Sequence, residues 1–286
     1  MVLKLIIGPL LGELKQFNIN YSMITYHDKR PRKAYRGDSC LWVETGRHSF
    51  IVILNNIIRK VEMKKIGMLT VGQSPRVDII PNMKQIIGDQ VTLIERGALD
   101  NLSKEEICSL APEKGVPAII SRLADGSSVV VAKKKLIDKV QLKINEFSEE
   151  GVELIVILCT GPLPGLKSNC LLVEAEKVVF QWVSALLHGQ GTLGVLTPLP
   201  EQKNEICDAF SDVATRTVVA SADPYGPISE VVQAGETFSK KGVDLILMDC
   251  MGYRNEHRSA LKTICHKPIL LSHAMVARTI AEITQI

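Results

Sequence analysis

One eleven-residue pattern occurs twice in the sequence and constrains the fold more than any other feature. Residues 151–161 read GVELIVILCTG and residues 242–252 read GVDLILMDCMG, with six of the eleven positions identical. A short apolar run of this kind is typical of a strand that is buried on both faces of a parallel sheet. A second related pair, IGMLT at 66–70 and LGVLT at 193–197, precedes the two copies. The sequence therefore predicts two related α/β lobes of unequal length.

Further short apolar runs alternate with longer amphipathic segments from Met63 onward, as expected when helices connect parallel strands. The predicted strands are 66–71, 91–95, 128–132, 154–159, 192–197, 215–221, 245–250 and 268–272. We assign 63–175 together with 268–286 to the first lobe and 176–267 to the second.

Three places carry the residue types that begin helices. Ser74 precedes a proline, which favours a helix start at that point. Ser103 and Glu106 have the spacing of a capping box, and Ser272 is positioned to cap a last helix over 273–284.

The first 62 residues differ in composition from the rest of the chain. They contain ten Lys or Arg and five Asp or Glu, a net charge of +5. Because the whole chain has a net charge of +3, the remaining residues have a net charge of −2. We expect residues 1–62 to be an N-terminal extension that is poorly ordered or not native. The basic run KRPRKAYR at 29–36 is interpreted as a solvated segment rather than a nucleic-acid site.

Composition narrows the class of protein. The 286 residues are 46% hydrophobic and 23% charged, as in globular proteins large enough for two domains. No apolar run is long enough to cross a bilayer, and no cleavage site follows the N-terminal segment, so we expect no membrane partner and a cytoplasmic location. The seven cysteines form no CxxC pair, and nucleotide, metalloprotease and hydrolase motifs are absent, so we predict no cofactor and no metal.

Cys159 and Cys250 occupy the same place in the two copies of the pattern, at the carboxyl ends of predicted strands. Ligands bind at that edge of a parallel sheet, where loops lead toward helix N-termini. Gly161 and Gly252 allow the backbone to turn there and approach a ligand. If a pseudo-twofold axis relates the lobes, both thiols face one cleft between them. One thiolate then removes a proton while the other thiol delivers one. The alternative for each cysteine is a small buried hydrophobic side chain.

Seven segments carry a resemblance to a known family: IGMLTVGQSPR (66–76), ERGALD (95–100), SRLADG (121–126), LCTG (158–161), TPLPEQ (197–202), DPYG (223–226) and DCMGY (249–253). They closely resemble the AroM family, from Met63 to the C-terminus. More distantly, the layout resembles the aspartate/glutamate racemase superfamily. That resemblance implies two flavodoxin-like lobes with mostly parallel sheets, and acid and base roles for Cys159 and Cys250 without a cofactor.

The sequence departs from those racemases immediately after each cysteine. Thr160-Gly161 stands where racemases typically have Asn-Thr, and Met251-Gly252 stands where they have Thr-His. The resemblance therefore does not imply an amino-acid substrate.

Several further residues are candidates for contact with a substrate. Arg76 and Arg96 are candidates to pair with a carboxylate, although surface or interlobe ion pairs are an equal alternative. His257 and His273 are weaker candidates for proton transfer, and Asp249 is interpreted as a structural partner outside the site. The predicted substrate-binding set is Gln73, Ser74, Arg76, Arg96, Thr160, Gly161, Met251, Gly252 and Tyr253.

Our leading hypothesis is a cofactor-independent racemase or isomerase that acts at the carbon next to a carboxylate of a small metabolite. One alternative is a single-cysteine decarboxylase or cis–trans isomerase of the same superfamily. Another is a non-catalytic protein that closes its two lobes over a small anion. A homo-oligomer is left open.

Overall fold

The computed structural model describes residues 22–26, 40–45, 48–53 and 64–284, with side chains from residue 65 onward. The chain divides into two compact units, residues 1–63 and 64–286. In the first unit, β1 (Ser22–Tyr26), β3 (His48–Ile53) and β2 (Cys40–Thr45) form an antiparallel sheet in that order. These strands fall within the predicted extension. The rest of that extension, including the basic run at 29–36, lies outside the described residues.

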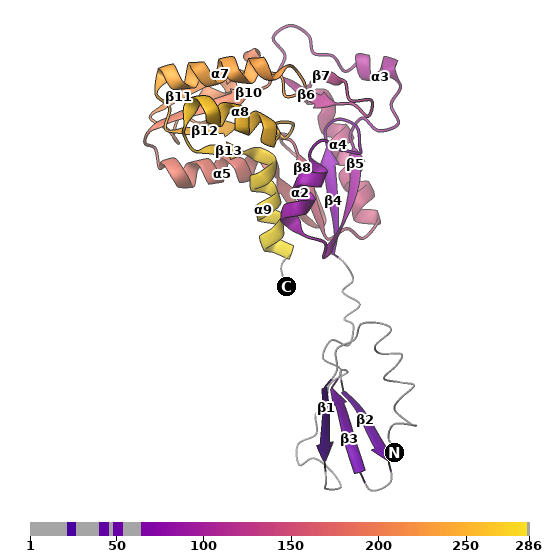
Figure 1. Ribbon diagram of the computed structural model, residues 1–286. Coiled ribbons are helices and arrows are strands. Elements are labelled where there is room, and N and C mark those ends of the chain that lie inside the picture. Colours follow the sequence, from indigo (N-terminus) through magenta and orange to yellow (C-terminus); the bar gives the residue numbers. More distant parts are fainter. Residues whose placement is uncertain (1–21, 27–39, 46–47, 54–63, 285–286) are drawn as a thin grey trace. The chain divides into compact units, whose positions relative to one another are not determined.

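The second unit contains two four-stranded sheets that share one strand order (Figure 1). In the first sheet the order is β5 (Val91–Gly97), β4 (Lys64–Thr70), β8 (Leu154–Leu158) and β9 (Leu171–Glu174), and all pairs are parallel. In the second sheet it is β11 (Arg216–Ser221), β10 (Thr192–Thr197), β12 (Leu245–Met248) and β13 (Ile269–Leu271), again all parallel. The predicted α/β fold with two flavodoxin-like lobes and mostly parallel sheets is confirmed.

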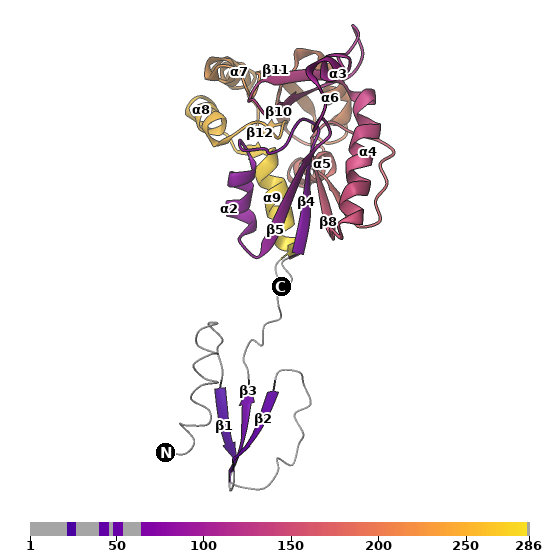
Figure 2. The same cartoon turned by 90° about the vertical axis from the view of Figure 1, so that its right-hand side faces the viewer.

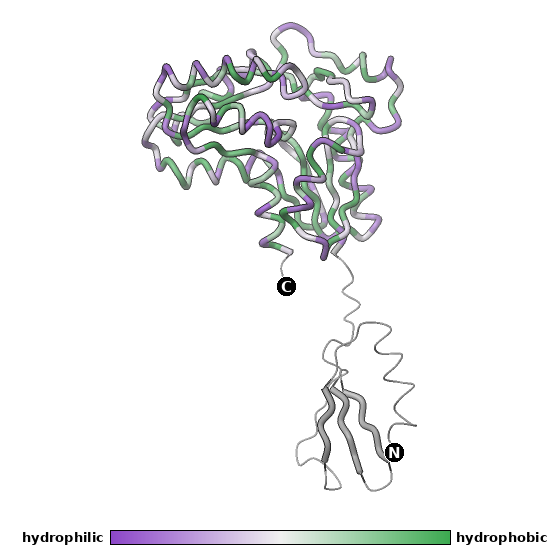
Figure 3. Tube along the Cα trace, in the orientation of Figure 1, coloured by the Kyte–Doolittle hydropathy of each residue, from purple (hydrophilic) through white to green (hydrophobic). Residues whose placement is uncertain are grey.

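Helices cover both faces of each sheet (Figure 2). On the first sheet, α4 (Lys133–Glu149) packs on one face, and α2 (Ile80–Ile87) and α9 (Ser272–Thr284) pack on the other. On the second sheet, α7 (Ile228–Lys241) and α8 (Asn255–Cys265) pack on one face. The opposite face is covered by α5 (Ala175–Leu187) and by α6 (Lys203–Ala209), which follows the short η1 (Pro200–Gln202). Figure 3 shows the apolar strands enclosed between these helices.

The two lobes use the same packing contact between a phenylalanine and a strand glycine. Phe147 of α4 and Phe238 of α7 are both fully buried. A Cβ atom on Gly67 of β4 would lie 2.9 Å from the Phe147 ring, and one on Gly194 of β10 would lie 3.1 Å from the Phe238 ring. Each ring therefore needs a glycine beneath it, which explains why IGMLT and LGVLT share that residue.

The start of the repeated pattern ends a helix in both lobes. Gly151 follows α4 with a φ of 70° and Gly242 follows α7 with a φ of 63°, a left-handed conformation that glycine adopts without a steric penalty. The chain then enters β8 or β12 directly. The two glycines thus set the direction of the strands that carry the cysteines.

Several predictions of local structure are corrected. The predicted strand 128–132, which is β7 (Ser128–Ala132), pairs with the unpredicted β6 (Ala118–Arg122) in a separate antiparallel hairpin. Strand β9 was not placed by the sequence. The short helix α3 (Lys104–Cys108) begins where the capping box of Ser103 and Glu106 predicted a helix start, and that capping box is confirmed. The segment assigned to the first lobe from 268 onward is divided, because β13 pairs with β12 in the second sheet while α9 packs against α2.

One predicted helix start is wrong, and one predicted cap is not formed although its helix is present. No helix begins at Ser74, because its backbone N–H and hydroxyl donate to Asp100 at 2.8 and 2.7 Å, and α2 begins only at Ile80. Ser272 is the first residue of α9, and its hydroxyl donates to the carbonyl oxygen of Met248 at 2.7 Å instead of capping the helix. No helix in the described part of the chain is long and apolar enough to cross a membrane.

Candidate functional site

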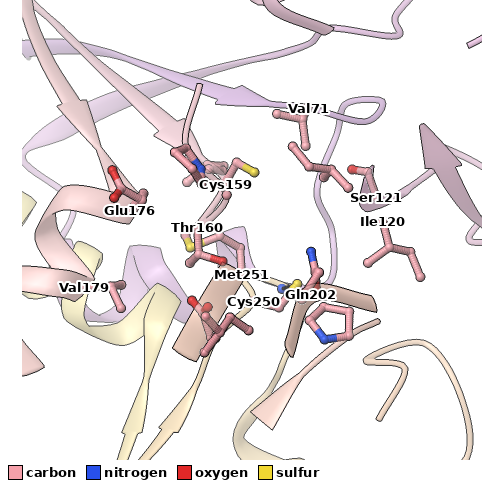
Figure 4. Close-up of a pocket in the computed structure, with 18 of the residues that line it drawn as sticks. Val71, Ile120, Ser121, Cys159, Thr160, Glu176, Val179, Gln202, Cys250 and Met251 are labelled. Atoms are coloured by element: carbon pink, nitrogen blue, oxygen red, sulfur yellow. Dashed lines mark hydrogen bonds between the residues drawn. The ribbon is translucent and has the colours of Figure 1, made fainter. Parts of the chain in front are cut away.

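The carboxyl ends of β8 and β12 meet at one cavity of about 110 Å³ (Figure 4). Cys159 follows β8 directly and Cys250 follows β12 after one residue, and both thiols line this cavity. A single water needs roughly 10–15 Å³ on a comparable measure, so the space suits a small molecule. The structure thus brings together two thiols that lie far apart in the sequence.

Each sulfur faces a backbone N–H from the glycine two residues later. The Gly252 N–H lies 3.4 Å from the Cys250 sulfur, and the Gly161 N–H is hydrogen-bonded to Cys159. Burial raises the pKa of Cys159 to about 11, although this N–H and the charge of Lys133 act against the increase. Burial raises the pKa of Cys250 to about 12, and the negative charge of Cys159 adds to it. Both groups are therefore thiols at neutral pH.

Arg76 lines the cavity from the loop between β4 and α2, not from inside a helix as predicted. Its Nε and Nη2 donate to the two carboxylate oxygens of Asp78 at 2.9 and 2.8 Å, and Nη1 donates to Thr70 at 2.9 Å. Burial disfavours both charges, but the hydrogen bonds between Arg76 and Asp78 outweigh it, so the pKa of Arg76 is raised and that of Asp78 is lowered. Because Asp78 occupies its paired donors, Arg76 is not free to clamp a carboxylate bidentately.

Tyr225 reaches the cavity from the loop after β11. Its hydroxyl oxygen accepts a hydrogen bond from Nη2 of Arg76 at 3.2 Å. A Cβ atom on Gly252 would lie 2.6 Å from this hydroxyl, so the glycine makes room for it. Burial raises the pKa of Tyr225, and the phenol remains protonated at neutral pH. This tyrosine belongs to the DPYG segment at 223–226, and the sequence alone predicted no role for it.

Two acidic side chains also line the cavity. Asp249, interpreted above as a structural partner elsewhere, lines the cavity beside Cys250. Burial raises its pKa to about 7, against a hydrogen bond from Thr160. Glu176 also lines the cavity, and its pKa is raised by burial. Lys133 also lines the cavity and forms an ion pair with Glu205.

An apolar wall completes the cavity. The rings of Phe180 on α5 and Phe210 after α6 are stacked, with centroids 5.7 Å apart. Ile120 of the β6–β7 hairpin lies across from Glu176 and Val179 of α5 (Figure 4), and Ile119 also lines the cavity. The cavity therefore combines two thiols, several charged and polar side chains and an apolar wall, the combination of shape and oriented polar groups that small-molecule sites use.

The comparison with protein families identifies the chain. The model of the AroM protein family matches residues 66–284. The chain belongs to the AroM family. No curated protein matches this AroM-family chain.

Solved structures share the fold of this AroM-family chain at low sequence identity. Glutamate racemase isoform RacE1 from Bacillus anthracis is 13% identical with a TM-score of 0.54, and the match covers 77% of this chain and 81% of that one. Aspartate racemase from Picrophilus torridus is 12% identical with a TM-score of 0.51, over 77% and 94%. A liganded double mutant of arylmalonate decarboxylase is 13% identical with a TM-score of 0.50, over 76% and 92%. The fold is thus one that racemases and a decarboxylase share.

The cavity of the AroM-family chain contains seven residues of the predicted site: Cys159, Cys250, Arg76, Thr160, Gly161, Met251 and Gly252. Four others do not line it. The Gln73 amide spans two loops, donating to the carbonyl of Leu99 and accepting from the N–H of Ala124. Ser74 bonds to Asp100, as described above. These two residues hold the loops around the site and do not face it.

Arg96 and Tyr253 are the other two residues that lie outside the cavity. Arg96 forms ion pairs with Glu146 and Glu150 and lies over the Phe147 ring, 5.5 Å from its centroid. Tyr253 is fully buried, and its hydroxyl donates to the carbonyl of Ala222 at 2.6 Å. Both therefore have structural roles.

The two histidines also lie away from the cavity. His257 Nδ1 accepts a hydrogen bond from the N–H of Arg254 at 2.9 Å, near the start of α8. His273 is buried at the start of α9, and burial lowers its pKa to about 4. Neither histidine is placed to exchange protons with a molecule bound between the cysteines.

Proposed function

We propose that the chain is a cofactor-independent racemase or isomerase that acts at a carbon next to a carboxylate. The observation that supports this most directly is that Cys159 and Cys250, from matched strand ends, line one cavity. A reaction that takes a proton from one face of a carbon and returns one to the other face needs two such groups.

The proton transfers balance without a further reactant. The thiolate of one cysteine takes the proton from the carbon, so the C–H bond breaks and an S–H bond forms. The electron pair moves into the adjacent carboxylate to give an enediolate. The opposing thiol then gives its proton to the other face of the carbon and becomes the thiolate.

Asp249 is the proposed acceptor of the proton that leaves Cys159 when the first thiolate forms. Moving a proton from Cys159, with a pKa of about 11, to Asp249, with a pKa of about 7, costs about 6 kcal/mol at about 1.4 kcal/mol per pKa unit. Turnover at about 10 per second corresponds to a barrier of roughly 16 kcal/mol. The cost of forming the thiolate therefore fits within the barrier of an ordinary enzyme.

The test is exchange of solvent deuterium into a panel of single-enantiomer, 2-substituted short carboxylates, followed by NMR and chiral chromatography. We expect at least one member to exchange and racemise, and Cys159→Ser and Cys250→Ser each to abolish racemisation. Cys108→Ser is the matched control, because this exposed cysteine on α3 lies outside the cavity.

The same experiment separates the alternatives. If only one serine variant loses activity, a single-cysteine decarboxylase or isomerase is favoured. If no carboxylate exchanges, and thermal stabilisation by a carboxylate survives both substitutions, the protein is a binding protein and the enzymatic proposal is wrong.

A further inference from the structure

The hydroxyl group of Tyr225, a half-buried side chain, is hydrogen-bonded on one side only. Its oxygen accepts from Nη2 of Arg76, which is itself only 3% exposed and fixed by Asp78. Among the described residues, no acceptor lies within hydrogen-bonding distance of the Tyr225 hydroxyl hydrogen. Because the side chain lines the cavity, that hydrogen is available to a bound molecule.

The surrounding backbone fixes this hydroxyl next to Cys250. It packs against the Cα of Gly252, and the N–H of the same glycine lies on the Cys250 sulfur. The loop of Tyr225 is itself held, because its N–H donates to the side chain of Asp223 at 2.9 Å. The donor is therefore fixed in place before any ligand binds, a condition under which a hydrogen bond stabilises developing charge most effectively.

The part of the cavity lined by Tyr225 also differs in charge from the rest of the lining. Arg76 brings a buried positive charge against the phenol oxygen, which strengthens the O–H as a donor. Elsewhere in the lining are the carboxyl groups of Asp249 and Glu176, which repel an anion. A carboxylate is thus favoured at the Tyr225 side and disfavoured at the Asp249 side.

We propose that Tyr225, held by Arg76, is the oxyanion site of this cavity and binds one carboxylate oxygen of the substrate beside Cys250. This inference rests on the proposed function, since it assigns the place where the enediolate charge develops. Tyr225 donates a hydrogen bond throughout and does not transfer its proton. Its raised pKa agrees with that role. The remaining part of the substrate then lies against the apolar wall of Ile119, Phe180 and Phe210.

The test compares two probes that differ only in the charged group, phenylacetate and 2-phenylethanol, by calorimetry on the full chain. We expect the wild type to prefer phenylacetate and Tyr225→Phe to weaken phenylacetate binding by roughly 10- to 100-fold, the usual effect of losing a hydrogen bond to a charged group. Binding of 2-phenylethanol changes little.

Tyr253→Phe is the matched control, because it removes the hydroxyl of a buried tyrosine whose partner is the Ala222 carbonyl. We expect it to lower thermal stability and to leave the preference for phenylacetate unchanged. Gly252→Ala provides a second variant. It displaces the Tyr225 hydroxyl from its position without removing it from the side chain.

The proposal is overturned if the wild type shows no preference for the carboxylate, or if both Tyr225→Phe and Gly252→Ala retain it. Failure of the proposed function gives a different result. In that case deuterium exchange does not depend on the two cysteines, whereas the loss of carboxylate preference in Tyr225→Phe persists.

Discussion

The end of β8 and the end of β12 hold a cysteine in the same way but in different surroundings. In both, a fully buried phenylalanine packs on a strand glycine, a left-handed glycine leads into the strand, and a glycine N–H faces the sulfur. Arg76 and Asp249 act on the pKa of both cysteines, whereas the charge of Lys133 acts on Cys159 and Tyr225 lies near Cys250. The common scaffold places the sulfurs, and the loops distinguish the two sides of the cavity.

The largest effect is expected where the two lobes are most alike. Phe147→Ala and Phe238→Ala should each lower the free energy of unfolding by about 3–5 kcal/mol, because each empties a fully buried site. Phe147→Ala should cost at least as much as Phe238→Ala, since Arg96 also packs over its ring. Chemical denaturation measures both. A cost below about 1 kcal/mol for either would show that the matched contacts are not equivalent.

The second-largest effect is expected at a position where the two lobes differ. Asp249 of the second lobe occupies the place in the repeated pattern that Leu158 occupies in the first. The pKa of Asp249 is raised by burial from 3.8 to about 7, so between these values the folded protein holds a proton that the unfolded chain releases. The unfolding free energy should therefore fall as pH rises from about 4 to about 7, by at most about 4 kcal/mol, and then level off.

Asp249→Asn is the measurement that isolates this effect, by denaturation across the same pH range. The variant should lack this decrease, and the difference between it and the wild type should be smallest near pH 4. A wild-type curve that rises with pH relative to the variant would contradict the direction of the pKa shift.

A smaller difference is expected between the exchange rates of two variants, each with a substitution at one of the glycines that follow the cysteines. Gly252→Ala places a methyl group 2.6 Å from the Tyr225 hydroxyl and should reduce the exchange rate by about 10- to 100-fold through displacement of that side chain. Gly161→Ala meets only Ile119 at 3.4 Å and the Cys159 sulfur at 3.6 Å, which are ordinary contacts. Its exchange rate should stay within a few-fold of wild type. Equal loss in both variants would mean that Tyr225 is not the reason for the difference.

The smallest effect concerns Arg96, which has no counterpart over Phe238 in the structure described here. Arg96→Met should cost about 1 kcal/mol or less, because its ion pairs with Glu146 and Glu150 are partly exposed. Deuterium exchange should remain unchanged, because Arg96 does not line the cavity. Loss of exchange in a stably folded Arg96→Met protein would restore it as a site residue.

The sequence predicted the central strands and the two cysteines because both depend on local patterns. Buried apolar runs such as 154–158 and 245–248 identify strands without tertiary information. The hairpin strand β6 (AIISR) and the edge strand β9 (LLVE) each contain only three consecutive apolar residues followed by polar ones, a pattern that does not differ from that of a loop segment. Ser74 failed as a helix start because Asp100, far along the chain, binds its N–H and hydroxyl.

The polar part of the site was harder to predict. Tyr253 and Tyr225 both follow strands of the second sheet, and only the direction of their side chains separates them. Tyr253 turns into the core toward Ala222, while Tyr225 turns toward Arg76 in the other lobe. Asp249 was placed on the wrong side by strict strand alternation, because β12 ends at Met248 and the alternation ends with it. Tertiary contacts of this kind leave no trace in a single sequence.

The last helix has a consequence for how a ligand enters. α9 follows directly from β13 of the second sheet, yet Val276, Ala277 and Ile280 belong to the same apolar core as α2 and the first sheet. Met251, one residue beyond Cys250, lies in that core as well. Separating the halves would expose these side chains to water, at about 25 cal/mol for each Å². We therefore expect the 64–284 region to behave as one rigid block, so that a ligand enters the cavity without a separation of the two lobes.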